Sequence, residues 1–175
     1  MTSFKTSTFS VLCVLLFALF SFTELKETSD EKALFKIGRS IDKNEIHYIL
    51  KLNNKGELNQ DEPLEIAWMN NEDAGQKEKM NWIKKKFGYG LTYNYINPFE
   101  ANFNFVSYQK RSFTLKKNKT GDFKVFTSSK GKMVEVQKIF INIEGGSFWI
   151  PNITYVELSA LEPQTNSLIH EIINP

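Results

Sequence analysis

Two arginines are the residues of this chain best suited to hold a ligand by its charge. Arg39 in "GRS" and Arg111 in "KRS" are the only arginines, and the other 20 of the 22 basic residues are lysines. Arginine presents a planar fork that can bind a carboxylate or phosphate through two parallel hydrogen bonds. Two interpretations stay open. Each arginine forms an ion pair with a carboxylate at a strand edge, or the two together bind an anion at one rim.

Other residue types give little support to catalysis. His47 and His170 are the two histidines, and they lie far apart in sequence without an HExxH pattern. The chain contains neither a GxSxG turn nor an SxxK pair, and "FGYGL" follows a predicted helix where a phosphate loop would precede one. We therefore predict no catalytic residue, no metal ligand and no cofactor. A non-catalytic protein is favoured over an enzyme.

Period-two alternation indicates how such residues are positioned. In "EIHYILKL" the apolar side chains of Ile46, Tyr48, Leu50 and Leu52 fall on one face, and the polar ones fall on the other. This pattern is typical of a half-buried antiparallel strand. Further strand patterns cover 64–69, 89–96, 101–108, 112–117, 123–128, 132–143, 153–161 and 168–173, and turn signals such as "NKTGD" separate them.

The fold class follows from this count. About nine to ten short strands with hairpin-type turns predict a mainly β protein, built as an antiparallel sandwich or closed barrel. The run 132–143 changes phase, because Val134 and Val136 lie on one parity and Ile139 and Ile141 on the other. A β-bulge near Gln137 to Lys138, or a strand that switches sheets, would account for the change.

One segment has a helical pattern. In "DAGQKEKMNWIKKKFG" a single stripe holds Met80, Ile83 and Phe87, Asp73 and Gln76 resemble a capping box, and Gly88 fits a C-terminal stop. We predict one helix over 74–87, with its lysines at 77, 79, 84, 85 and 86 forming a solvated surface. Trp82 lies about 130° round the helix from the apolar stripe, at about 100° per residue. It is therefore a candidate interaction residue.

The N-terminus has the pattern of a secretory signal peptide. Lys5 precedes an uncharged apolar run, 11–20, that contains Cys13, the only cysteine. The run is shorter than the roughly 20 residues that a spanning helix needs. We expect a signal peptide over 1–22, a leader over 23–33 and a single β domain over 34–175. The mature chain would lie in the periplasm or outside the cell, without a disulfide or a stable membrane span.

Charge excludes one class of partner. The formal net charge is +2, from 22 basic and 20 acidic residues, which is too balanced to predict nucleic-acid binding. The partner is then an unidentified small molecule or a protein of the cell envelope.

A resemblance to a known family is carried by "FKIGRSIDKNEIHYILKLNNKGELNQDEPLEIAWM", "NWIKKKFGYGL", "VSYQKR", "VQKIFI" and "FWIPNITYVEL". These stretches resemble an uncharacterised bacterial family, domain of unknown function four-eight-three-three, over residues 34–173. The resemblance implies a single exported bacterial domain and no assigned activity. Arg39 and Ser40 belong to the shared pattern whereas His47 departs from it, so the resemblance favours Arg39 as a site residue.

Three hypotheses result for the function. The first is a non-catalytic exported β domain that binds a small ligand or a partner protein, with Arg39, Arg111 and Trp82 as candidate binding residues. The second is a hydrolase or transferase of unfamiliar type, with both arginines, Lys110 and an acid such as Glu45 gathered at one rim. The third is a structural protein of the envelope that docks a partner through Trp82.

Overall fold

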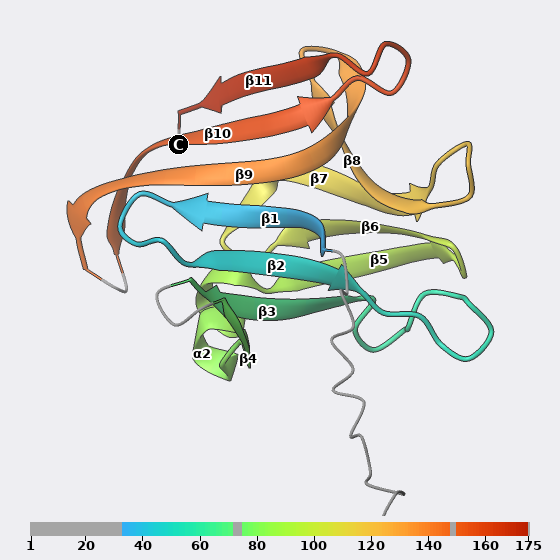
Figure 1. Ribbon diagram of the computed structural model, residues 1–175, viewed down its shortest axis with the longest axis horizontal. Helices are drawn as coiled ribbons and strands as arrows, with labels where there is room; N and C mark the ends of the chain where they lie inside the picture. Colours follow the sequence, from blue (N-terminus) through green and yellow to red (C-terminus); the bar gives the residue numbers. More distant parts are fainter. Residues whose placement is uncertain (1–32, 72–74, 148–149, 175) are drawn as a thin grey trace, which may run out of the picture. The chain divides into compact units, whose positions relative to one another are not determined.

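Strand-forming alternation gives a mainly β protein with a short helical piece, as predicted. The computed structural model describes residues 33–71, 75–147 and 150–174 (Figure 1). Its eleven strands form one sheet: β1 (Ala33–Arg39), β2 (Glu45–Leu50), β3 (Leu64–Asn70), β4 (Gln76–Lys79), β5 (Leu91–Asn97), β6 (Glu100–Phe105), β7 (Tyr108–Lys117), β8 (Phe123–Ser129), β9 (Lys132–Gly146), β10 (Pro151–Leu161) and β11 (Leu168–Ile173). Between β4 and β5 lie the helical pieces α2 (Trp82–Lys84) and η1 (Lys85–Tyr89).

The predicted signal peptide and most of the leader lie outside the described residues, and so do Cys13 and Asp73. The strands belong to one compact unit, Glu31–Pro175. Within the described ranges, no helical segment combines the length and the apolar character that crossing a membrane requires.

The long strand β9 holds the sheet together because it changes partner along its length. Residues 132–135 pair antiparallel with β8, residues 138–141 pair parallel with β1, and β10 pairs along β9 from residue 135 to residue 146. The register passes from Lys138 opposite Ser159 to Val136 opposite Ala160, so Gln137 is an extra residue in β9. The predicted bulge is confirmed, and it lies where β9 exchanges one partner for another.

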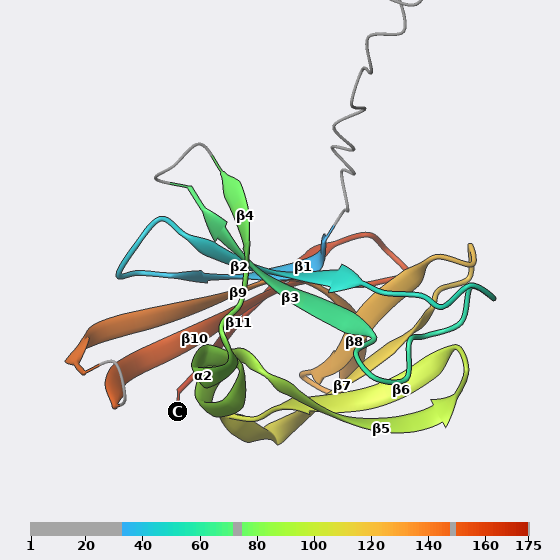
Figure 2. The same ribbon diagram turned by 90° about the horizontal axis from the view of Figure 1, so that it is seen from below.

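Two groups of strands diverge from this bulge. We call β1–β4 the first wing and β5–β8 the second wing; the strand order is β4-β3-β2-β1-β9-β8-β7-β6-β5, and β10 and β11 extend the sheet from β9. The wings curl toward each other as an open half-barrel (Figure 2). The predicted sandwich or closed barrel is therefore not confirmed. The purely antiparallel pairing is also corrected, because β1 and β9 run parallel.

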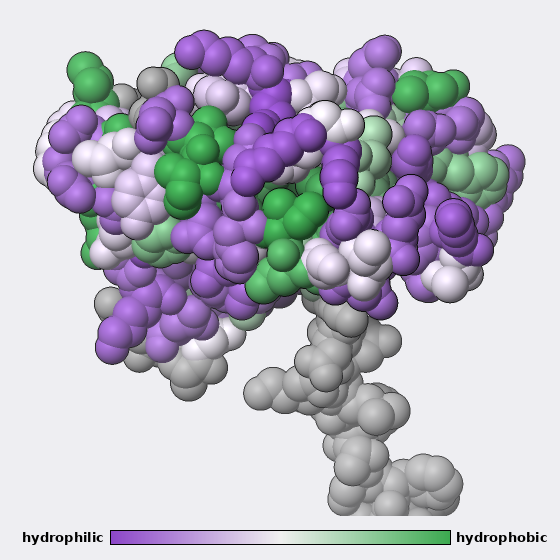
Figure 3. Space-filling model, turned by 90° about the horizontal axis from the view of Figure 1, so that it is seen from above, coloured by the Kyte–Doolittle hydropathy of each residue, from purple (hydrophilic) through white to green (hydrophobic). Residues whose placement is uncertain are grey.

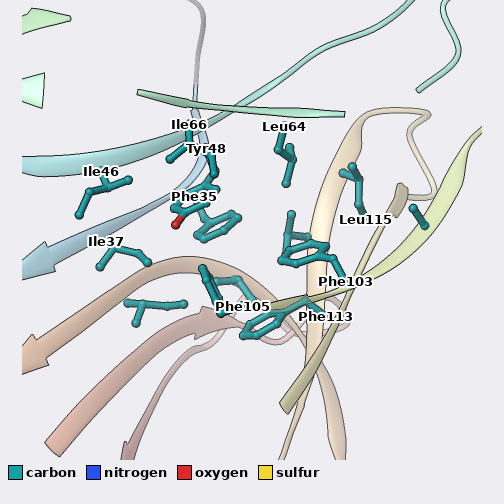
Figure 4. Packing of buried hydrophobic residues seen from close by; sticks show 14 of the residues in the cluster. Phe35, Ile37, Ile46, Tyr48, Leu64, Ile66, Phe103, Phe105, Phe113 and Leu115 are labelled. Atoms are coloured by element: carbon teal, nitrogen blue, oxygen red, sulfur yellow. The ribbon is translucent and has the colours of Figure 1, made fainter. Parts of the chain in front are cut away.

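Aromatic side chains from both wings fill the space between them. Phe35 of β1 stacks on Tyr48 of β2 with ring centroids 4.3 Å apart, and Phe103 of β6 stacks on Phe113 of β7 at 5.3 Å. Phe35 and Phe103, at 6.4 Å, join the two pairs across the wings (Figure 4). Burial of such rings is the main stabilising contribution to a fold of this kind.

Strand β2 has the two faces that its alternation predicts over most of its length. Ile46 and Tyr48 are fully buried, whereas Leu52, beyond the end of the strand, is 42% exposed. On the opposite face, Glu45 forms ion pairs with Lys36 and Lys138. Seen from above, the molecule is mostly hydrophilic, with hydrophobic side chains in separate patches (Figure 3).

The predicted helix over 74–87 is wrong in its first half. Gln76–Lys79 forms β4, which pairs antiparallel with β3, and among the described residues of this segment helical structure is confined to α2 and η1. The free edge of β3 supplies backbone partners that an isolated helix start would lack, so tertiary pairing outweighs helix propensity. The cap is Asn81, whose Oδ1 accepts a hydrogen bond from the Lys84 N–H at 2.9 Å. Met80 is buried as expected, but Phe87 is 57% exposed.

Candidate functional site

A cavity of about 870 Å³ lies between the curled sheet and the helical turn. Its lining residues come from β1, β9, β10 and β11 and, on the other side, from α2, η1 and the β6–β7 hairpin. Figure 2 shows how these elements are arranged. The lining is predominantly apolar, and its branched aliphatic residues include Ile37, Ile41, Ile83, Ile139, Ile141, Ile143, Ile150, Ile153, Val156, Leu158 and Ile173. We call this space the isoleucine cavity.

The alternation in β1 explains how the cavity is reached from the core. Phe35, Ile37 and Arg39 are two residues apart, so their side chains share the inner face of the strand. Phe35 is part of the aromatic core, while Ile37 and Arg39 line the cavity. The strand therefore runs from the filled interior to the hollow one.

The bulge in β9, the strand next to β1, turns a second set of side chains toward the cavity. Val134 and Val136 are fully buried in the core, and Ile139 and Ile141 line the cavity although they lie on the other parity. One extra residue at Gln137 shifts the alternation, so both sets face inward. Without it, the isoleucines of β9 would point to solvent.

The helical turn is fixed to the first wing by a buried hydrogen bond. The hydroxyl of Tyr48, a fully buried residue, donates to the backbone carbonyl of Tyr89 at 2.8 Å, and burial raises the pKa of Tyr48 well above its usual value. The turn closes with the Gly90 N–H donating to the Lys85 carbonyl at 2.8 Å. This geometry holds Ile83, Lys84 and Tyr89 against the cavity.

Arg39 lines the cavity beside the aromatic rings of Trp68 and Tyr89. Its Nη1 donates to the Tyr89 hydroxyl at 3.1 Å, and its Nη2 forms an ion pair with Asp42. The guanidinium carbon lies 4.6 Å from the ring centroid of Trp68, within cation–π range. The side chain is 10% exposed, and its Nε is buried without a hydrogen-bond partner.

Lys84 shares the same aromatic ring. Its Nζ lies 3.6 Å from the Trp68 centroid, and it makes no ion pair with any carboxylate of the described residues. The pKa of Lys84 is lowered, first because burial disfavours the ammonium and then because the Arg39 guanidinium is near. Asp42 and Glu78 offset part of this effect. Lys84 was expected on a solvated surface, and its place in the cavity corrects that expectation.

Arg111 lies at a different part of the lining, in a saturated ion pair. Its Nη1 and Nη2 donate to the two carboxylate oxygens of Glu171 at 3.0 and 2.7 Å. The hydrogen bonds from Arg111 lower the pKa of Glu171, although its partial burial acts in the opposite direction. Arg39 and Arg111 thus both line the same cavity, and each is also paired with a carboxylate. The ion-pair interpretation of both arginines is therefore confirmed, and anion binding by the two together stays a prediction.

The remaining candidates lie elsewhere. Glu45 is on the outer face, where burial raises its pKa but hydrogen bonds from Lys36 and His47 and nearby lysine charges leave it lowered overall. Glu45 and Lys110 are not among the residues that line the isoleucine cavity. Trp82 is 67% exposed and borders a second cavity of about 530 Å³, so the structure does not bring it to the arginines.

The sequence could have indicated several of the missed residues. Ile139, Ile141 and Ile143 were visible as a phase change in β9, but alternation cannot show whether an inward face meets packing or empty space. Trp68 and Tyr89 belong to strand-like patterns and were not distinguished from core residues. Among the described residues, no cluster of His, Cys, Asp and Glu could hold a metal ion.

Fold and site together define an all-β domain, an open half-barrel with an apolar cavity and cationic groups in its lining. The family model described as "Domain of unknown function (DUF4833)" matches residues 35–172, and the chain belongs to this family. Neither the curated proteins nor the solved structures gave a match to the chain.

Proposed function

We propose that this protein is a non-catalytic binding protein that holds an apolar small molecule in the isoleucine cavity. The observation that carries the proposal is the cavity itself. Its volume of about 870 Å³ is within the range of roughly 300–1,000 Å³ typical of small-molecule sites, and its lining is mostly aliphatic and aromatic. A ligand there would remove apolar surface from water on both sides, which is the main source of affinity for such molecules.

The composition of the lining supports binding over catalysis. The described residues that line the cavity include no His, Asp, Glu or Cys. The lining hydroxyls of Ser107 and Ser147 are hydrogen-bonded to backbone groups, so among the described residues neither has a general base as its partner. The alternative is an enzyme using a rim of Arg39, Arg111, Lys110 and Glu45. It is less well supported, because Glu45 and Lys110 lie outside the lining.

A neutral fluorescent probe can test the binding proposal. N-phenyl-1-naphthylamine becomes bright in apolar surroundings, so its titration into the protein should give a saturable rise in fluorescence. Ile141→Trp places an indole in the cavity and should weaken probe binding at least about tenfold, a loss of about 1.4 kcal/mol. Val156→Phe, at a second lining position, should weaken it in the same direction.

Met133→Trp provides the matched control on the same strand. Met133 belongs to β9, is 51% exposed and does not line the cavity, so its replacement should leave probe binding unchanged. Thermal melts would establish that all three variants are folded. No saturable binding, or binding that both lining variants retain in full, would refute the proposal.

We also propose that the protein works outside the cytoplasm. The support is the N-terminal pattern of Lys5 followed by the apolar run 11–20. N-terminal sequencing of the protein from cell fractions should find an exported chain that begins near residue 23. An unprocessed N-terminus in the cytoplasmic fraction would contradict the assignment.

A further inference from the structure

The charged side chains in the lining of the isoleucine cavity all have the same sign. They are Arg39, Lys84 and Arg111, and none of the described lining residues is acidic. A concave, apolar-walled site with charges of one sign attracts the opposite charge on a ligand. The cavity is therefore complementary to an apolar molecule that has a negatively charged end.

The two arginines in the lining differ in what they can still bind. Both terminal nitrogens of Arg111 donate to Glu171, in the geometry that satisfies guanidinium and carboxylate together. Arg39 instead divides its terminal nitrogens between the Asp42 carboxylate and the neutral Tyr89 hydroxyl, and its buried Nε has no partner. The hydrogen-bonding capacity of the Arg39 guanidinium is therefore not used up by a single carboxylate, in contrast to that of Arg111.

Lys84 adds a second positive charge beside Arg39. Its ammonium is stacked over the Trp68 ring and has no carboxylate partner among the described residues. The lowered pKa of Lys84 reflects burial first and repulsion from Arg39 second. An anion placed between the two cations would therefore be stabilised by both.

We propose that the isoleucine cavity binds a single-chain amphiphile, with its anionic head group beside Arg39 and Lys84 and its hydrocarbon chain along Ile37, Ile139 and Ile141. This inference rests on the proposed function and adds the chemical class and the orientation of the ligand. The head group is a carboxylate or a phosphate, because both present the oxygens that the two cations recognise.

Competition against N-phenyl-1-naphthylamine separates charge from chain length. Dodecanoate, dodecyl phosphate, dodecanol and dodecyltrimethylammonium share a twelve-carbon chain and differ in head group. The ionic compounds are used below their micelle concentrations and dodecanol below its solubility limit. At about pH 8 the carboxylic acid is ionised. One or both anions should displace the probe at a concentration about tenfold lower than dodecanol, and the cation should be the weakest competitor. Which anion competes best identifies the head group.

Two lysine variants locate the head group. Lys84→Met keeps the length of the side chain and removes its charge, so it should abolish most of the preference for anions and leave dodecanol binding unchanged. Lys86→Met is the control, because Lys86 is exposed on the same helical turn and does not line the isoleucine cavity. Added salt should weaken anion binding to the unsubstituted protein more than to Lys84→Met.

Failure of this inference is distinguishable from failure of the proposed function. If the probe binds and dodecanol competes as well as both anions, the assignment of an anionic head group is wrong while the apolar site stands. The assignment is equally wrong if the preference for anions survives in Lys84→Met. If the probe itself does not bind, both proposals fall.

Discussion

The interior of this half-barrel is filled in one region and hollow in the next, although the same strands line both. In the filled region, rings from the two wings meet. The ring centroid of Phe103 lies 6.4 Å from that of Phe35 and 5.3 Å from that of Phe113. In the hollow region, Ile139 and Ile141 face a short helical turn across a space of about 870 Å³. The inner face of β1 passes from Phe35 in the first region to Arg39 in the second.

The difference shows that an inward-facing apolar residue does not by itself make a packed core. Filling requires side chains of matching size from the opposite wall, as the second wing provides for Phe35. The turn over 82–89 is too short to provide them for the isoleucines of β9. The isoleucine cavity, which is the proposed binding site, therefore lies where side chains from the two walls stop packing against each other.

The largest expected effect is in the filled region. Phe103→Ala removes a ring that contacts several others, and it should lower the free energy of unfolding by about 3–5 kcal/mol, as for other buried Phe→Ala changes. Ile141→Ala in the hollow region should cost only about 1 kcal/mol, because its side chain already borders open space. Urea unfolding of the two variants measures the contrast. Equal losses would mean that the cavity wall is packed as tightly as the core.

Replacing a valine by phenylalanine should change the free energy of unfolding in opposite directions in the two regions. Val125→Phe places a ring where Val125 is fully buried, so overpacking should cost about 1–3 kcal/mol. Val156→Phe places the same ring in the cavity and should increase the free energy of unfolding by about 0.5–2 kcal/mol, as cavity-filling changes commonly do. Thermal denaturation of the two variants tests this pair. Destabilisation by Val156→Phe would show that the space cannot accept a ring.

The smallest expected effect concerns the ion pair between Arg111 and Glu171. Folding lowers the pKa of the Glu171 carboxyl, which is Arg111's partner. The ionised carboxylate therefore stabilises the folded protein at pH values above the unfolded-state pKa of about 4.3. This stabilisation is lost as the pH falls through the lower pKa of the folded state. Glu171→Gln should therefore cost about 1 kcal/mol at neutral pH, the upper range for partly exposed pairs. Its difference from the unsubstituted protein should disappear in acid.

Chemical denaturation at several pH values would follow this difference. Glu100→Gln is a suitable control, since Glu100 makes no ion pair with any of the described residues. A pH-independent cost for Glu171→Gln would indicate a role of the side chain other than pairing with Arg111.

Local patterns were sufficient for most strands and insufficient for the helix. Strands such as β3, β8 and β11 were predicted within about two residues because alternation is a property of the segment itself. The segment 76–79 has helix-forming residues, yet it is a strand, because the free edge of β3 lies beside it. The candidate site was predicted in part: Arg39 and Arg111 share a cavity, while Trp82 lies at another and Lys84 was missed.

By itself, the sequence determined the mainly β class, the inward and outward faces of the strands, and the change of phase near Gln137, since each depends on the spacing of neighbouring residues. The tertiary structure alone decided that the sheet stays open, that β1 runs parallel to β9 and that the isoleucines border a cavity. It also brought Lys84 to Arg39 across the ring of Trp68. The physical reason is that pairing and packing depend on the partner that each face meets, and that partner comes from a distant part of the chain.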